Sequence, residues 1–257
     1  MAGMQTLVTE DARALAELAS GLLLARISDA LLARGSARVI LAGGNTPRET
    51  YTLLAAGISE QRIPLSSVGW FLGDERWVPR DDPRSNEGMA RAALLSKISA
   101  PEESIHGWNA AAGDPVACAR RYADDIAREM GGFGPDLLIL GLGADGHTAS
   151  LFPGATAFLP GGDRVPVGHD MPGVAAAVEA GADKGWRLTL CPQFLRTSRS
   201  VIFLVAGADK SAALRRVLAA DPATPGAWIR GESTFYVVTR DATGPERPNH
   251  GQEIRHA

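Results

Sequence analysis

The stretch that decides the fold is Leu137-Leu-Ile-Leu-Gly-Leu-Gly-Ala-Asp-Gly-His147. Its first four residues are wholly apolar, which is typical of a strand buried on both faces of a parallel sheet. A glycine-rich segment that carries Asp145 and His147 follows at once. In both directions from this stretch, short apolar runs alternate with longer amphipathic ones. The alternation predicts an α/β protein with a largely parallel sheet.

The same periodicity gives the approximate bounds of the elements. Apolar runs predict strands at 38–42, 68–72, 137–140, 174–178, 187–190, 201–205 and 235–239. Amphipathic runs predict helices over 11–34, 86–95, 115–130 and 209–219, with a loop at 101–109. A further helix should begin at Pro47, capped by Thr46, and reach about Ala56. Residues 154–173 are rich in Gly and Pro and too long for a routine connection, so we expect a mobile loop beside the site.

Composition limits the kind of protein this can be. The chain has 257 residues, of which 45% are hydrophobic and 21% are charged, as in soluble globular proteins. We expect one domain over residues 1–243 and a disordered tail over residues 244–257. The formal net charge of -3 argues against a large surface for nucleic acid or an anionic membrane. No apolar stretch approaches the roughly 20 residues of a membrane-spanning helix.

Cysteine usage points to a reducing compartment. The two cysteines, Cys118 and Cys191, form no CxxC pair, and no histidine stands near them at the spacing of a zinc site. The sequence therefore predicts neither a disulfide framework nor bound metal, and it fits a cytoplasmic protein.

Four of the predicted strands end alike, in segments rich in Gly and in polar or charged residues. These segments are residues 43–46, 73–76, 141–147 and 207–210. The carboxyl ends of parallel strands lie along one edge of a sheet, and ligands bind in the crevice outside that edge. We therefore expect the four segments to converge on one site.

The first segment has the features of a phosphate cradle. Gly43 and Gly44 let the backbone turn, so that the amides of Asn45 and Thr46 point from a helix N-terminus, where an anion is favoured. The alternative is an ordinary strand-to-helix turn. The segment lacks the GK[ST] of a nucleotide-binding P-loop, and no nucleotide is indicated.

The third segment matches GxGxxG at Gly141, Gly143 and Gly146, a pattern found in dinucleotide sites. However, Asp145 and His147 would place a carboxylate and an imidazole where a pyrophosphate needs bare amides. His147 has a carboxylate two residues earlier, which is the setting of a general base whose tautomer a neighbour fixes. A purely structural role for His147 stays open.

The second and fourth segments supply charges. Arg76 and Lys210 each follow an apolar strand at the expected ligand edge, where they could hold an anion. They could equally be surface cations, with Asp74, Glu75 and Asp209 as their ion-pair partners.

Five motifs, taken together, resemble 6-phosphogluconolactonases, and they cover about residues 5–241. They are Leu41-Ala-Gly-Gly-Asn-Thr-Pro47; Gly73-Asp-Glu-Arg-Trp-Val-Pro79 with Ser85-Asn86; Gly141-Leu-Gly-Ala-Asp-Gly-His-Thr-Ala-Ser-Leu-Phe-Pro-Gly154; Arg187-Leu-Thr-Leu190; and Phe203-Leu-Val-Ala-Gly-Ala-Asp-Lys210. The resemblance implies a three-layer α/β/α Rossmann-like fold, shared with glucosamine-6-phosphate deaminases. It also implies hydrolysis of 6-phospho-D-glucono-1,5-lactone to 6-phosphogluconate in the oxidative pentose phosphate pathway, without metal or cofactor.

The resemblance also assigns roles to residues. His147 corresponds to the general base, Arg76 and Lys210 to the phosphate and substrate clamps, and Asp74 to the carboxylate that orients the sugar. Residues 43–46 match the family's strand-end loop, and we count Asp145 among the substrate-binding residues. The expected partner is a sugar-phosphate lactone, with no nucleic acid or membrane, and the chain is expected to be a monomer or a small homo-oligomer.

Four positions depart from the family's pattern. Ala42 and Asn45 stand where Ser is usual, Ala144 where Glu is frequent, and Cys191 where Thr is usual. The first two changes remove hydroxyls from the strand-end loop.

Two other functions remain to be weighed. One is an aminosugar-phosphate deaminase or isomerase on the same fold, with Asp74 as a proton-transfer base. That branch has Asp-Gly-His-Ile-Ala-Phe-Asn, whereas residues 145–151 read Asp-Gly-His-Thr-Ala-Ser-Leu. The other is a non-catalytic sugar-phosphate sensor, which the joint presence of His147, Asp74, Arg76 and Lys210 disfavours.

Overall fold

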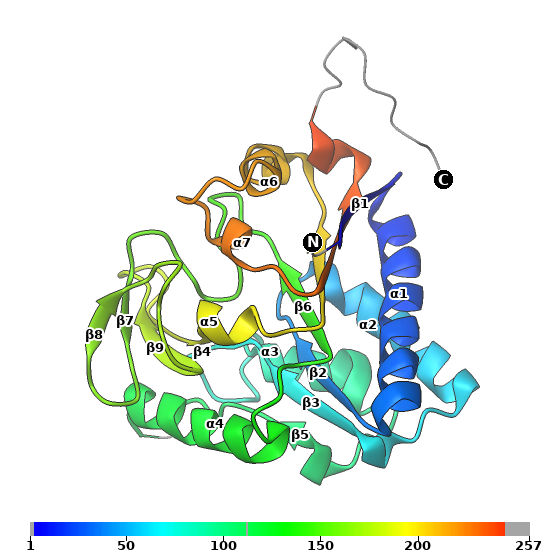
Figure 1. Ribbon diagram of the computed structural model, residues 1–257, viewed down its shortest axis with the longest axis horizontal. Coiled ribbons are helices and arrows are strands. Elements are labelled where there is room, and N and C mark those ends of the chain that lie inside the picture. Colours follow the sequence, from blue (N-terminus) through cyan, green and yellow to red (C-terminus); the bar gives the residue numbers. More distant parts are fainter. Residues whose placement is uncertain (1–2, 112, 245–257) are drawn as a thin grey trace.

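A parallel seven-stranded sheet forms the centre of the computed structural model, which describes residues 3–111 and 113–244 (Figure 1). Every pair of neighbouring strands in it is parallel. In spatial order the strands are β1 (Gly3–Thr9), β12 (Ser233–Thr239), β11 (Ser200–Val205), β6 (Leu137–Gly141), β2 (Ala37–Leu41), β3 (Val68–Leu72) and β5 (Ile105–His106). The carboxyl ends of β2, β3, β6 and β11 thus lie along one edge.

A second, antiparallel sheet lies beside the first. In order it contains β4 (Asp74–Arg76), β10 (Trp186–Leu190), β9 (Ala175–Glu179), β7 (Thr156–Phe158) and β8 (Arg164–Pro166). Strand β4 follows β3 after the single residue Gly73. One stretch of chain therefore belongs to both sheets.

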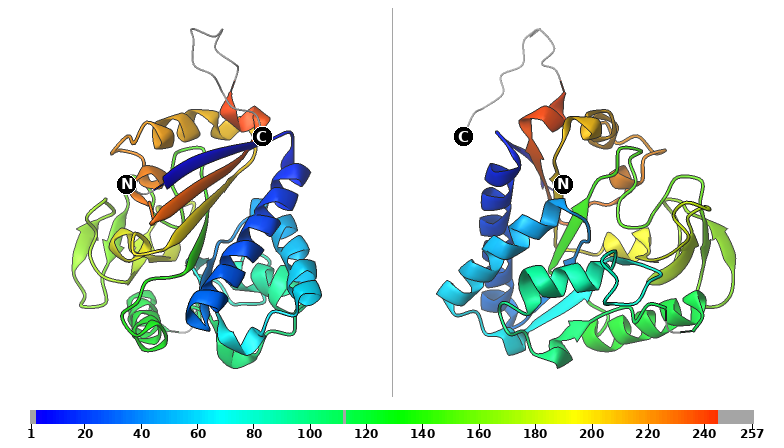
Figure 2. Two further views of the ribbon diagram at one scale, coloured as in Figure 1. Left: turned by 45° about the vertical axis from the view of Figure 1, so that its right-hand side comes forward. Right: turned by 180° about the vertical axis from the view of Figure 1, so that it is seen from behind.

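Helices cover both faces of the parallel sheet. They are α1 (Ala12–Arg34), α2 (Thr46–Gln61), α3 (Asn86–Ala90), α4 (Pro115–Met130), α5 (Pro192–Leu195), α6 (Ser211–Leu218) and α7 (Pro225–Trp228), with the short turns η1 (Leu65–Ser67), η2 (Arg91–Leu95), η3 (Glu102–Ser104), η4 (Ala208–Lys210) and η5 (Arg240–Thr243). Helices α1 and α2 pack together on one face, whereas α6, α7 and the second sheet lie on the other (Figure 2).

The apolar pattern explains this layering. Strand β11 is buried along its whole length, and the buried positions of α1 include Leu15, Leu23 and Ile27. The side chain of Asp11 caps α1 by accepting the Ala14 N–H at 2.9 Å. The α/β class, the largely parallel sheet and the single Rossmann-like domain are confirmed.

Several details differ from the expectations. Strand β1 was not predicted, because it lies at the sheet edge, where six of its seven residues are exposed or half-buried and show no clear alternation of polar and apolar side chains. The expected loop over 154–173 contains β7 and β8, two short strands of three residues each that give no periodic signal. The expected loop over 101–109 likewise contains η3 and β5.

The start and end of α2 also needed correction. Thr46 is the first residue of the helix and not its cap; Asn45 precedes it with helical backbone angles and no capping hydrogen bond from its side chain. The helix continues to Gln61, well beyond Ala56, because Tyr51, Leu54 and Ile58 keep a buried stripe. The predicted tail, residues 244–257, lies outside the described residues except for Gly244.

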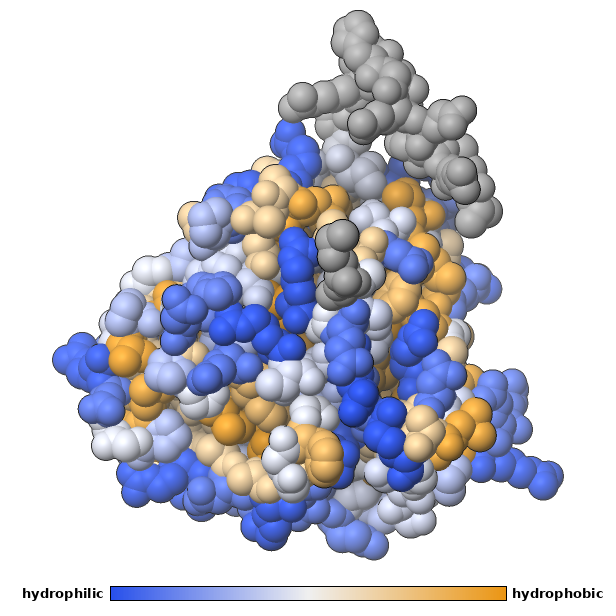
Figure 3. Space-filling view, in the orientation of Figure 1, coloured by the Kyte–Doolittle hydropathy of each residue, from blue (hydrophilic) through white to orange (hydrophobic). Residues whose placement is uncertain are grey.

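The visible surface in Figure 3 is dominated by hydrophilic residues, with apolar areas between them. The large apolar side chains that are exposed include Met4, Val8, Leu18, Leu32 and Phe133. Among the described residues, no helix has both the length and the apolar character that crossing a membrane requires.

Candidate active site

The four strand-end segments open into one cavity of about 390 Å³. Its lining includes most of the sequence-predicted site residues, namely Gly43, Gly44, Asn45, Thr46, Asp74, Arg76, His147 and Lys210. Asp145 is not part of this lining and contacts His147 from behind. The parallel order of β2, β3, β6 and β11 explains the convergence.

The turn after β2 is shaped by two close approaches. The Tyr51 hydroxyl accepts the Ala42 N–H at 2.8 Å and donates to the Ala42 carbonyl at 2.9 Å, so α2 is attached to the strand end. A Cβ atom added at Gly43 would lie 1.8 Å from Asn86 Oδ1. Gly44 has φ +100°, a conformation that L side chains rarely adopt. Gly43 is thus required by the close approach of the Asn86 side chain and Gly44 by its backbone conformation. The N-terminus of α2 faces the cavity.

Asp74 is a buried carboxylate on the opposite wall. Its Oδ1 accepts from Asn86 Nδ2 at 3.1 Å, and its Oδ2 accepts from the Ser150 hydroxyl at 2.7 Å. Burial raises the pKa of Asp74 above its ordinary value, whereas the Ser150 hydrogen bond and the charge of Arg76 act in the opposite direction. The carboxylate is therefore held in one orientation by two neutral donors.

His147 and Asp145 form a pair. The Asp145 carboxylate lies 2.5 Å from His147 Nδ1 and also accepts the His147 backbone N–H at 3.0 Å. Burial acts to raise the pKa of Asp145, but these two hydrogen bonds from His147 outweigh it, and the net pKa lies below the ordinary value. An ionised Asp145 at Nδ1 leaves Nε2 as the ring nitrogen that is free to exchange protons.

The ring of His147 is fixed on its other sides as well. It contacts the Phe152 ring at a centroid distance of 4.5 Å. A Cβ atom at Gly143 would come within 2.1 Å of His147 Nδ1 and 2.6 Å of Asp145 Oδ1. Gly143 thus makes room for the pair, which is a physical reason for the glycine pattern other than a dinucleotide.

Three cations lie on or near this cavity. Lys210 forms an ion pair with Asp209, with Nζ and Oδ2 2.9 Å apart. Arg76 donates to the Arg84 carbonyl and is directly opposite Arg187 in the β4–β10 pair. Burial, followed by the charge of Arg76, lowers the pKa of Arg187. Two arginines at opposed positions of a strand pair supply positive charge that favours an anion nearby.

Asn86, Ser150 and Arg187 were missed as site residues by sequence reasoning, although each stands in one of the quoted motifs. The sign of them in the sequence was their place in these motifs. Which residues reach Asp74 depends on contacts between α3, β4 and the segment after β6, and the sequence does not show those contacts. Two of the four departures, Ala42 and Asn45, line the cavity, whereas Cys191 is buried outside its lining. Burial raises the pKa of the Cys191 thiol to about 12, which leaves it unreactive.

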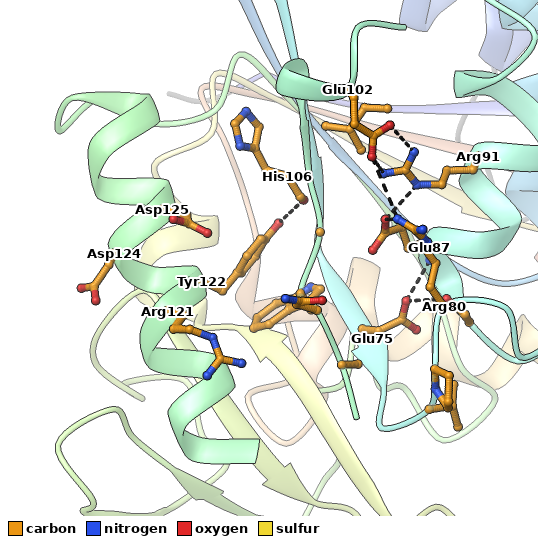
Figure 4. A pocket seen from close by; sticks show the side chains of 18 residues that line it. Glu75, Arg80, Glu87, Arg91, Glu102, His106, Arg121, Tyr122, Asp124 and Asp125 are labelled. Carbon is orange, nitrogen blue, oxygen red and sulfur yellow. Dashed lines mark hydrogen bonds and ion pairs between the residues drawn. The ribbon is translucent and has the colours of Figure 1, made fainter. Parts of the chain in front are cut away.

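A second, larger cavity of about 690 Å³ lies next to β4 and is shown in Figure 4. Successive strand residues point to opposite sides, and Glu75 accordingly lines this cavity. Arg91 occupies its wall with ion pairs to Glu87 at 2.8 Å and to Glu102 at 2.6 Å. Glu75 itself accepts hydrogen bonds from the backbone N–H groups of Asn86 and Glu87. The charged groups of this cavity are thus engaged in holding the start of α3 in place. We therefore assign the chemistry to the smaller cavity, which His147 and Lys210 line.

Metal ligation has no evident basis in the described part of the chain. Within residues 3–111 and 113–244, no three His, Cys, Asp or Glu side chains are grouped as ligands of one ion would be.

The close approach of Gly43 and Asn86 gives a testable prediction. Gly43→Ala should lower the free energy of unfolding by about 1–3 kcal/mol, because the new methyl group displaces Asn86 from Asp74. Gly141→Ala is the matched control, since Gly141 lines the same cavity and an added Cβ meets nothing within 4 Å. Urea unfolding measures both variants; equal stability of the two would mean that Asn86 moves aside freely.

Comparison with known proteins agrees with this geometry. Residues 10–237 match the family described as glucosamine-6-phosphate isomerases/6-phosphogluconolactonase. A 6-phosphogluconolactonase of Synechocystis sp. is 41% identical over 204 residues, covering 77% of this chain and 78% of the relative, and one of Nostoc sp. is 33% identical over 247 residues, covering 93% and 96%. The crystal structure of 6-phosphogluconolactonase from Thermotoga maritima superposes with a TM-score of 0.78 at 28% identity, covering 92% of this chain and 100% of that one. The chain therefore belongs to the family of glucosamine-6-phosphate isomerases and 6-phosphogluconolactonases.

Proposed function

We propose that the chain hydrolyses 6-phospho-D-glucono-1,5-lactone to 6-phospho-D-gluconate, a step of the oxidative pentose phosphate pathway. The observation that carries the proposal is the Asp145–His147 pair, because the His147 imidazole lines a cavity that Arg76 and Lys210 also line. Family membership and relatives that are themselves 6-phosphogluconolactonases support it.

His147 acts as the general base in this proposal. With Nδ1 engaged by Asp145, Nε2 takes a proton from a water molecule as its oxygen attacks the lactone carbonyl. The tetrahedral intermediate then collapses with cleavage of the bond to the ring oxygen, which receives the proton back from His147. Proton transfer of this kind contributes about 10²- to 10⁴-fold.

The phosphate group is remote from the reacting carbon, and its binding orients the lactone. Arg76 offers a planar pair of donors, Lys210 a point charge, and the N-terminus of α2 the amides of Asn45 and Thr46. Binding energy from this end holds the carbonyl against His147 and lowers the entropic part of the barrier. Asp74, fixed by Asn86 and Ser150, accepts hydrogen bonds from the sugar hydroxyls.

The deaminase or isomerase alternative is not favoured. That reaction would use Asp74 as a mobile proton carrier, whereas here both of its oxygens are engaged by side-chain donors. The relatives named above are lactonases, and the Thr148-Ala-Ser150 continuation supplies the hydroxyl that holds Asp74.

We place the enzyme in the cytoplasm, because Cys118 and Cys191 are buried free thiols that suit a reducing compartment. A monomer or small homo-oligomer remains our expectation for its assembly.

The substrate assignment can be tested with purified protein. It should release acid from freshly prepared 6-phosphogluconolactone, with the same rate in the presence of a chelator, and should release no ammonia from glucosamine 6-phosphate. A pH-indicator assay and an ammonia assay give the two rates. Ammonia release comparable to lactone opening would favour the deaminase alternative.

The base assignment gives a second test. His147→Ala should lower kcat at least about a hundredfold and leave the affinity for 6-phosphogluconate nearly unchanged, because the imidazole acts on the water and not on the phosphate. Steady-state kinetics and calorimetric titration measure the two effects. Turnover near the wild-type value would exclude His147 as the base and direct attention to Asp74.

The cations give a third test. Arg76→Ala and Lys210→Ala should each weaken 6-phosphogluconate binding by about 1.5–3 kcal/mol, the range for hydrogen bonds to charged groups. Gluconate, which lacks the phosphate, is the control ligand, and its weak binding should hardly change. Unchanged affinity for 6-phosphogluconate in both variants would leave the α2 amides as the phosphate site.

A further inference from the structure

Arg216 of α6 reaches the loop that carries His147. Its Nη2 donates to the carbonyl oxygen of Asp145 at 2.7 Å. The side chain is 46% exposed and comes from an element 71 residues away in the sequence. No motif of the sequence drew attention to it.

The loop contacted by Arg216 is a tight turn. Gly143 N–H donates to the His147 carbonyl at 2.8 Å, and Gly146 N–H donates to the Gly143 carbonyl at 3.0 Å. Gly146 has φ +92°, a conformation suited to glycine. The Asp145 carbonyl therefore points out of the turn, away from the bonds that close it, and needs a donor from elsewhere.

The surroundings of Gly146 show how closely α6 and α7 pack on this turn. An added Cβ there would lie 2.8 Å from Arg216 Nη2 and 2.6 Å from Thr224 Cγ2. The Gly226 N–H donates to the Gly146 carbonyl at 3.0 Å. Successive carbonyls of the turn, those of Asp145 and Gly146, are thus bound from outside by the α6–α7 region.

Arg216 is itself held in place. Its Nε lies 3.9 Å from Asp221 Oδ2, and the Asp221 carboxylate also accepts from the Thr224 hydroxyl at 3.0 Å. The Asp221 N–H in turn donates to the Arg216 carbonyl at 3.0 Å. The guanidinium is therefore oriented toward the turn before any ligand binds.

We infer that Arg216 is a positioning residue for the Asp145–His147 pair. It is not among the residues that line the cavity, and it acts through the Asp145 backbone. By fixing the peptide between Asp145 and Gly146, it fixes the carboxylate that selects the His147 tautomer. This role rests on the proposed function for its kinetic part, while the geometry of the pair can be measured without turnover.

The variants to compare are Arg216→Ala, Arg216→Lys and Arg215→Ala. Arg215 is the matched control, because it is the neighbouring exposed arginine on α6 and its side chain donates only within the helix, to the Ser211 carbonyl at 3.5 Å, among the contacts of the described residues. Lysine retains a donor that can reach a carbonyl, so Arg216→Lys should recover part of what Arg216→Ala loses.

The kinetic expectation is a loss confined to kcat. Arg216→Ala should lower kcat roughly 10- to 100-fold, since small misplacements of a reacting group have effects of this size, and leave KM and 6-phosphogluconate affinity within about twofold. Rates are taken per folded molecule, as determined by circular dichroism. A rise in KM at unchanged kcat would overturn the inference, because it would indicate contact with the substrate.

The spectroscopic expectation concerns the proton between His147 Nδ1 and Asp145. Its downfield proton NMR signal, identified by its loss in His147→Ala, should broaden or vanish in Arg216→Ala and persist in Arg215→Ala. A wild-type signal together with wild-type kcat in Arg216→Ala would refute the positioning role. Should the wild-type protein open no lactone, the proposed function fails, yet the NMR comparison still decides the role of Arg216.

Discussion

The burial of the Asp74 carboxylate is the constraint on which the rest of the site depends. Removing a carboxylate from water is unfavourable by several kcal/mol unless donors replace the solvent. Here the donors are Asn86 and Ser150, which come from α3 and from the segment after β6. Satisfying one buried group therefore fixes three separate parts of the chain around the cavity. The same requirement explains Gly43, whose missing side chain leaves the space that Asn86 occupies.

The residues of the candidate site come from both sheets. The parallel sheet supplies the turn at α2, the loop of His147 and the start of α6, all at the carboxyl ends of its strands. The antiparallel sheet supplies Arg76 and the opposed Arg187. Gly73, the only residue between β3 and β4, joins these contributions. His147 and Lys210 thus follow strands of the parallel sheet, whereas Arg76 and Arg187 belong to the antiparallel sheet. Lys210 immediately precedes α6, and Arg216 lies within that helix.

Sequence reasoning predicted the parts of the candidate site that follow from local rules, and the structure brings most of these residues to one cavity. Glycine-rich strand ends and the two-residue spacing of Asp145 and His147 are readable because parallel strands place their ends together. Asn86, Ser150 and Arg216 were not identified, since each acts through a contact between elements far apart in the chain. In the fold, three strands were not predicted. Strand β1 lies at a sheet edge, and β7 and β8 have three residues each, so none of them shows the apolar alternation on which such predictions rest.

Strand β4 places two adjacent acids in different surroundings, with Asp74 in the reactive cavity and Glu75 among the hydrogen bonds that begin α3. The register of β4 against β10, in which Asp74 is opposite Thr189, determines which acid faces which side. A shift by one residue would turn Asp74 away from the cavity, because every side chain of a strand changes face together. If Glu75 came to lie opposite Thr189, its longer side chain would face the cavity, and Arg76 would take the position that Glu75 holds near the start of α3. The length of the chain between β3 and β4, which is the single residue Gly73, is consequently under tight constraint: an insertion or deletion there would change which side chain of β4 faces the cavity.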